Sequence, residues 1–267
     1  MPNDGPILRF DVHPDYSSGF VFSWDFAGGF EDPLPWVMRV QAAKSPDGPW
    51  TDISPELEGV SAWKSPGGHR VNKSASMFFR LSVETPAGTR LSSVVSPYGD
   101  LGRYDFLLGA EVMRREVLHM ANMAGVRCSV WKRVGYGPRC PACTDPVTGH
   151  SRNNHCRRCL GTGRAMPYSG PFETWCLFSE DSAHKSGEGN EGVGMTEDRR
   201  FEARMVNSVP VSKNDVVRDD TTGKMHYVNE VRIVAELRRV PLVQLLSVSE
   251  AAVTDPAYMI PEVCRGS

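Results

Sequence analysis

The sequence has no long run of apolar residues. No apolar stretch approaches the ~20 residues that a helix needs to cross a bilayer, so we expect no membrane partner. The first residues, Met1-Pro-Asn-Asp-Gly5, lack both a basic and an apolar segment, which predicts no secretory signal. The chain also lacks an excess of either charge, with a net charge of −2 and a pI of about 6.4. This balance gives no global attraction to nucleic acid or to a membrane surface.

The signatures of common catalytic sites are also missing. No HExxH motif occurs, no GK[ST] accompanies the glycines of 185–194, and the seven histidines are scattered. We therefore expect that the chain is not an enzyme. The alternative is a Cys-His nucleophile that uses Cys128 or Cys176, although leftover cysteines more often serve as small buried apolar residues.

Two CxxC pairs are the most specific feature that is present. Cys140-Pro-Ala-Cys143 and Cys156-Arg-Arg-Cys159 are separated by twelve residues. Each pair presents two thiolates from a tight turn, and together they complete a tetrahedral shell of four sulfurs around Zn²⁺. The sequence thus predicts a structural Zn²⁺ held by Cys140, Cys143, Cys156 and Cys159. Two disulfides or four free thiols are the alternatives.

Residues around the two pairs refine this prediction. Gly161 and Gly163 follow the second pair and predict positive φ angles close to the metal-bound sulfurs. His150 and His155 are possible substitute ligands, but four cysteines already fill the shell. Four thiolates leave no open position for water, so we do not expect a catalytic zinc. The insert between the pairs is polar, and its fold must come from the metal, which can supply ~10 kcal/mol or more.

Three further cysteines, Cys128, Cys176 and Cys264, lie far apart in the sequence. With the two pairs they make an odd count of seven, which fits folding in a reducing cytoplasm better than a disulfide framework. Cys128 belongs to an alternating segment, and we expect it on the buried side of a strand.

Residues 1–99 show the pattern of short strands separated by turns. Apolar and polar residues alternate at period two in several segments, namely Ile7–Val12, Gly19–Trp24, Trp36–Gln41, Met77–Val83 and Thr89–Val95. About seven strands in about ninety residues predict a β-sandwich.

Over residues 6–98 this pattern resembles a fibronectin type III module. The resemblance rests on Trp24, the strand Trp36–Gln41, the turn Ser45-Pro-Asp-Gly-Pro-Trp50 and the strand Phe78-Phe79-Arg80-Leu81-Ser82-Val83. Phe79 stands where that family usually has tyrosine, so the hydrogen bond of that tyrosine is not expected. The resemblance implies a binding or spacing unit. We expect Trp24, Trp36 and Trp50 to pack in its core or at its edge rather than to form a ligand platform.

A helix and a strand are predicted over 100–137. Apolar residues recur at steps of three and four, at Phe106, Ala110, Met113, Val117, Met120 and Ala124. Asp105 is the expected N-cap and Gly125 the expected stop. Glu111 and Arg115 can pair on the exposed side. After Gly125, residues 126–134 alternate as a strand.

Residues 171–250 predict a small β-barrel. The expected strands are Phe172–Phe178, Phe201–Val206, Asp215–Arg218, Lys224–Val228, Val231–Leu237 and Leu242–Val248. The segment 219–223 predicts a hairpin turn between two of them, and 180–200 predicts a long loop. The whole chain is thus predicted to be mainly β. Its expected parts are a fibronectin III-like β-sandwich (1–99), a linker helix and strand (100–137), a zinc knot (138–170), a small β-barrel (171–250) and an extended tail (251–267).

Residues 100–260 resemble neck or connector proteins of tailed-phage virions. The resemblance rests on Arg114-Arg115-Glu116, on 137–145 with the first cysteine pair, on 156–163 with the second, on 211–217 and on His226-Tyr227-Val228. It implies a structural virion protein, assembled in the host cytoplasm, that forms a homo-oligomeric ring at the head–tail junction. The implied partners are other virion proteins, such as a portal or adaptor and a tail or sheath terminator, and DNA passing through the ring.

Two rival functions remain open at this point. The arginines around Cys156 and Cys159 suit a nucleic-acid-binding zinc protein, because arginine neutralises phosphates. The sandwich over 6–98 suits a host-surface adhesin. The second cysteine pair is also similar to one CxxCxGxG repeat of DnaJ-type zinc domains. That family carries four such repeats and this chain has one, so a chaperone is not the favoured interpretation.

Overall fold

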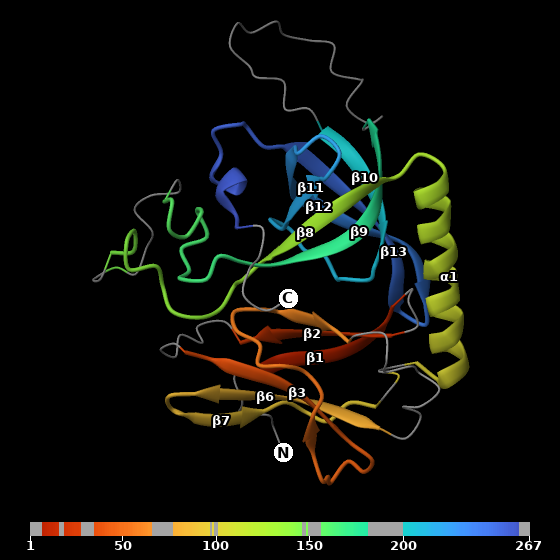
Figure 1. Ribbon diagram of the computed structural model, residues 1–267, viewed down its shortest axis with the longest axis vertical. Coiled ribbons are helices and arrows are strands. Elements are labelled where there is room, and N and C mark those ends of the chain that lie inside the picture. The colour runs from red at the N-terminus through yellow and green to blue at the C-terminus, as the bar shows by residue number, and fades with distance from the viewer. Residues whose placement is uncertain are drawn as a thin grey trace, which may run out of the picture.

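The structure is a computed structural model of the chain, shown in Figure 1. It describes residues 7–15, 19–27, 35–65, 77–96, 98, 101–145, 148, 156–180 and 200–261. A sandwich of two sheets (lower in the view) and a closed barrel (above it) lie one over the other, and helix α1 runs along the side of both. The prediction of a mainly β chain with a sandwich, a linking helix and a barrel is confirmed.

The N-terminal sandwich consists of two antiparallel sheets. One sheet has the strand order β1-β2-β5 and the other has the order β4-β3-β6-β7. The strands are β1 (Ile7–Pro14), β2 (Phe20–Phe26), β3 (Val37–Ala43), β4 (Thr51–Asp52), β5 (Ala62–Lys64), β6 (Phe78–Thr85) and β7 (Gly88–Leu91). The chain changes sheet between β2 and β3, so the inner faces of both sheets face each other and bury their apolar side chains.

Aromatic side chains fill the space between these sheets. Trp24 and Trp36 are 2 % and 1 % exposed, and Trp50 lies at an edge with the guanidinium of Arg80 4.2 Å from its ring centroid. The expectation that these tryptophans pack in the core or at its edge is confirmed. Phe79, which replaces the tyrosine of the fibronectin pattern, is buried against neighbouring phenylalanine rings.

Helix α1 (Arg103–Asn122) joins the sandwich to the barrel. Its predicted apolar face is buried along the length of the helix, at Phe106, Ala110, Met113, Val117 and Met120. Phe106 packs into the sandwich core, whereas Met113 and Val117 pack against the barrel. The helix therefore contacts both units with one continuous face. Ala124 lies beyond its end and is exposed.

The ends of α1 differ in part from those expected. The N-cap is Gly102, not Asp105, and it makes no side-chain cap bond. Asp105 lies in the first turn, where its carboxylate is 2.6 Å from the Arg238 side chain and is therefore already engaged. The helix ends two residues before the expected stop, with Met123 as its C-cap, and Gly125 follows the cap. The Gly125 N–H donates to the Met120 carbonyl at 2.8 Å, and a Cβ on Gly125 would lie only 2.7 Å from that same oxygen.

The barrel is closed by six strands in the order β10-β13-β12-β11-β8-β9. They are β8 (Val126–Arg133), β9 (Tyr168–Glu180), β10 (Arg200–Val206), β11 (Val216–Asp219), β12 (Met225–Leu237) and β13 (Val240–Glu250). β8 lies within the segment 100–137, which was predicted to be a linker. It belongs to the barrel because it pairs with β9 on one side and β11 on the other. Residues 138–165, with both cysteine pairs, are thus inserted between two paired barrel strands.

Two details of the barrel bear on the sequence predictions. The segments 224–228 and 231–237 form one strand, β12, rather than two, because a register shift between Val228 and Glu230 absorbs the break in alternation as a bulge. The predicted turn at 219–223 is confirmed. Gly223 has φ +73°, and its N–H donates to the Asp219 carbonyl at 2.7 Å.

The tail also differs from expectation in its described part. Instead of running extended, it forms the 3₁₀ helix η2 (Pro256–Met259), whose N-cap Asp255 accepts a bond from the Ala257 N–H. Ala257 and Ile260 are buried beside the barrel, which explains why the segment folds back. Most of the predicted loop 180–200 lies outside the described residues.

Candidate metal centre

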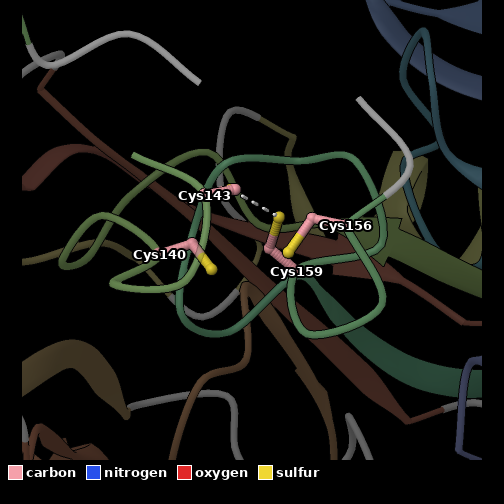
Figure 2. A group of neighbouring side chains, drawn as sticks. All are labelled: Cys140, Cys143, Cys156 and Cys159. Atoms are coloured by element: carbon pink, nitrogen blue, oxygen red, sulfur yellow. Dashed lines mark hydrogen bonds between the residues drawn. The ribbon is translucent and has the colours of Figure 1, made fainter. Parts of the chain in front are cut away.

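The four cysteines of the two CxxC pairs form one cluster. Their Sγ atoms all lie within 4.8 Å of one another, and those of Cys143 and Cys159 are 3.4 Å apart. Figure 2 shows the four side chains converging on one space from two separate loops. A tetrahedral ion with Zn–S bonds of about 2.3 Å requires sulfurs about 3.8 Å apart, so the cluster is close to the spacing that a metal needs. The predicted ligand set is brought together.

Backbone hydrogen bonds hold the two loops side by side. The Cys140 N–H donates to the Gly163 carbonyl at 2.9 Å, and the Ala165 N–H donates to the Pro138 carbonyl at 3.0 Å. Gly161 and Gly163 have φ of +79° and +74°, as predicted, and Leu160 shares this left-handed conformation at +49°. The chain can therefore turn tightly around the sulfurs of the second pair.

The cluster is buried although the loops that carry it are small. All four cysteines are at most 8 % exposed and form a cluster of their own, separate from the sandwich and barrel cores. The six described cysteines are not joined in disulfides, which disfavours the alternative of two disulfides. A buried cluster made of four cysteine sulfurs is the arrangement expected of a closed structural metal site.

The protonation of these thiols differs along the cluster. Backbone N–H groups of Cys159 and Arg158 bond to the Cys156 sulfur and lower the pKa of that thiol to about 7. Burial raises the pKa of Cys159 to about 12, and it also raises the pKa of Cys140. The cluster without a metal therefore retains protons that a divalent cation would displace on binding.

Contacts on both sides anchor the knot segment, which we define as residues 138–170. On the barrel side, Leu160 lies in an apolar cluster with Trp131 and Tyr168. On the sandwich side, Met166 approaches Gly59 so closely that a Cβ on Gly59 would lie 2.5 Å from the Met166 sulfur. The knot segment that carries the metal centre thus contacts both the sandwich and the barrel.

The other residues singled out in the sequence are distributed as follows. Cys128 and Cys176 are fully buried in the barrel core, away from the metal centre, and the prediction for Cys128 is confirmed. The hydrogen bond with the neighbouring Cys176, together with burial, raises the pKa of Cys128, so this thiol is protonated and a poor nucleophile. His150, His155 and Cys264 lie outside the described residues.

Sequence reasoning missed the residues that attach the metal centre to the rest of the chain. These are Tyr136, Leu160 and Met166. Tyr136 and Val134 belong to the sandwich core although they follow a barrel strand. Tyr136 in Val134-Gly-Tyr-Gly137 could have indicated this contact. A loop seldom needs a tyrosine between two glycines, so such a residue suggests packing against another part of the chain.

Comparisons with known proteins add no identification. No family model matches the chain, and no curated protein matches it. Among the described residues, no helix has the length and apolar character to span a bilayer.

Proposed function

We propose that this chain is a structural protein of a tailed-phage neck, which forms an oligomeric ring at the head–tail connector and is stabilised by a structural Zn²⁺. The observation that carries the proposal is the buried four-sulfur centre in a segment that contacts both the barrel and the sandwich. A site there serves to fix the relative position of the two units. Its complete sulfur shell leaves no position for a substrate.

Zinc is the metal that fits this donor set best. Tetrahedral coordination by four thiolates is typical of structural zinc and of iron sites. Zinc has no redox chemistry, which suits a site whose part is to hold a shape. Elemental analysis of protein purified without added metal is expected to find one zinc per chain. Iron with a visible charge-transfer band, or no metal, would contradict the assignment.

The barrel and the helix support an assembly protein. The six strands close the sheet, so the barrel has few free strand edges, and α1 presents one whole side to solvent. The order of sandwich, helix, knot segment and barrel is also that of the neck resemblance. We expect the purified chain to form rings with a defined copy number, which mass photometry and negative-stain electron microscopy would detect. A chain that stays monomeric alone and in the assembled particle would defeat this proposal.

A second candidate function rests on exposed arginines at the metal centre. Arg157 and Arg158 lie between the cysteines of the second pair, and both are exposed to solvent. They could neutralise phosphates of DNA passing through a ring or of another nucleic acid. The test is a DNA-binding measurement at several salt concentrations with the full chain and with the Arg157→Ala/Arg158→Ala variant. Salt-dependent binding that the variant loses, without rings, would favour this candidate over the neck protein.

A further inference from the structure

The face of α1 that points away from the molecule carries a regular stripe of side chains. The α1 stripe consists of Tyr104, Leu108, Glu111, Arg115, Leu118 and Asn122, at alternating steps of four and three residues. This is the spacing of the d and a positions of a coiled coil. The stripe lies opposite the buried face of the helix, and α1 forms the outer edge of the described molecule in Figure 1.

The α1 stripe is apolar towards both ends and charged in the middle. Tyr104 is 87 % exposed, Leu108 52 % and Leu118 45 %. At the centre, the Arg115 side chain lies 2.8 Å from the carboxylate of Glu111. The solvent-facing side of a surface helix usually carries polar residues, so large apolar residues at this spacing require a separate explanation.

The order of these residues makes the α1 stripe complementary to itself in one orientation. When two copies of α1 run antiparallel about a two-fold axis near Met113, Leu108 of one faces Leu118 of the other. In the same register, Glu111 faces Arg115 and Tyr104 faces Asn122, so each a position meets a d position. A parallel pair would instead place Glu111 on Glu111 and Arg115 on Arg115, which is repulsive.

We propose that the α1 stripe binds the α1 stripe of a second copy of this chain in antiparallel orientation. The leucines supply the buried apolar area, and the central Glu111 and Arg115 exchange ion-pair partners between copies and fix the register. Such a contact is isologous. It is distinct from the head-to-tail contacts that close a ring, so it joins two chains whether or not the proposed ring forms.

The first test measures self-association of the full chain by sedimentation equilibrium over a wide concentration range. Leu108→Asp and Leu118→Asp are each expected to raise the dimer dissociation constant by at least about tenfold, because each places an unpaired charge in the apolar part of the seam. The control is Leu8→Asp on β1, where the leucine is 72 % exposed and is not part of the stripe. It should leave the constant unchanged. Far-UV circular dichroism checks that α1 remains folded in all variants.

The second test exchanges the charges at the centre of the stripe. Glu111→Arg and Arg115→Glu, each alone, replace two attractive contacts by two repulsive ones and should weaken the dimer. An equimolar mixture of the two variants should dimerise like the wild type, because each then meets the opposite charge. Effects within one helix are the same before and after mixing, so recovery on mixing reports the contact between copies.

Three results would overturn the proposal: a wild-type chain that never dimerises, equal weakening by Leu8→Asp and the stripe variants, or single charge variants that dimerise like the wild type. The last result would exclude the antiparallel register. The ring proposal is tested separately from the dimer, because rings appear as a larger species. Leu108→Asp is expected to leave the copy number of that species unchanged.

Discussion

The hydroxyl of Tyr136 donates a hydrogen bond to the backbone carbonyl of Val60. Tyr136 lies between barrel strand β8 and the first cysteine pair, whereas Val60 belongs to the sandwich. The tyrosine ring stacks on Trp36 with centroids 5.4 Å apart and planes 4° from parallel. Burial raises the pKa of Tyr136, so the hydroxyl stays protonated and available as a donor. The segment that leads into the metal centre is therefore part of the sandwich core.

This relationship predicts that sandwich and barrel unfold together. Tyr136→Phe should lower the free energy of unfolding by about 1 kcal/mol, because Val60 keeps its second donor, the Trp24 indole N–H at 3.0 Å. Tyr136→Ala should cost about 3–5 kcal/mol, because it also opens a cavity among aromatic rings. Urea unfolding followed by tryptophan fluorescence and by circular dichroism measures both effects. Leu8→Ala, at an exposed site outside the α1 stripe, is the control. Separate transitions for the two probes, with Tyr136→Ala shifting only one, would contradict this prediction.

Loss of the metal should affect more than the inserted loops. Cys159→Ser is expected to abolish stoichiometric zinc binding, since a hydroxyl replaces one of four thiolates. Leu160 would then lose its fixed position in the apolar cluster beside Trp131, so the melting temperature of the barrel should fall as well. Hydrogen exchange locates the change: protection should drop over 138–145 and 156–165 and, to a smaller degree, in β8.

The matched control for this experiment is Cys128→Ala. It removes a buried thiol that lies in the barrel core and not in the metal centre. Its zinc content should equal that of the wild type, with a modest loss of stability. Treatment of the wild type with a chelator should reproduce the exchange pattern of Cys159→Ser. An unchanged pattern after complete zinc removal would show that the loops fold without the metal.

The clustering of the four cysteines could be predicted from the sequence, whereas the contacts that attach this candidate metal centre to the rest of the chain could not. A CxxC turn is determined by a few neighbouring residues, and the positive φ angles at Gly161 and Gly163 are equally local. The contact of Tyr136 with Val60 and that of Met166 with Gly59 join residues from different units. They depend on how the units are placed relative to each other, which local patterns do not encode.

The same distinction explains the differences within the fold. Alternation of Val126, Cys128 and Val130 correctly indicated a strand, but alternation does not identify the strands it pairs with. β8 was therefore assigned to a linker rather than to the barrel. Likewise, Asp105 has the chemistry of an N-cap, but its carboxylate pairs with Arg238, which is distant in the sequence. In each case a long-range contact decided between locally acceptable structures.

His13 predicts how stability depends on pH. Burial, with smaller contributions from Arg9 and Lys132, lowers the pKa of His13 to about 4, and its Nε2 lies 2.9 Å from the Ser23 hydroxyl. The unfolded chain takes up this proton near pH 6.5 and the folded chain only near pH 4. The contribution of His13 to the free energy of unfolding is therefore complete above about pH 6.5 and declines as the pH falls towards 4. The total loss is about 3 kcal/mol.

The measurement for His13 is the free energy of unfolding of the wild type and of His13→Gln between pH 7 and pH 4. The variant should be less stable than the wild type at pH 7, and the difference should shrink as the pH falls. Some slope should remain in the variant, because burial also lowers the pKa of His226. A constant difference over this range would show that His13 is not held neutral in the folded chain.

A buried ion pair beside the sandwich–barrel junction gives the last prediction. The Lys132 ammonium lies 3.7 Å from the Asp215 carboxylate, and both side chains are nearly inaccessible to water. The same carboxylate accepts bonds from the N–H groups of Arg133 and Ser212, each at 2.7 Å, while Lys132 also donates to the Pro210 carbonyl. Burial raises the pKa of Asp215, and Lys132 and these N–H groups act in the opposite direction.

Replacing Asp215 should therefore lower the free energy of unfolding more than replacing Lys132. Asp215→Ala leaves a buried ammonium and two buried N–H groups without their acceptor, and should cost about 3–5 kcal/mol. Lys132→Met keeps the volume of the side chain and leaves the carboxylate its two backbone donors, so it should cost less. In the double variant the unpaired ammonium is absent, and the loss should be smaller than the sum of the two single losses by more than about 1 kcal/mol. Urea unfolding of the four proteins at pH 7 gives this coupling directly. Strict additivity would mean that Asp215 is important for its backbone bonds alone and not for its charge pairing with Lys132. A larger loss for Lys132→Met than for Asp215→Ala would contradict the expectation that the two backbone donors compensate the buried carboxylate.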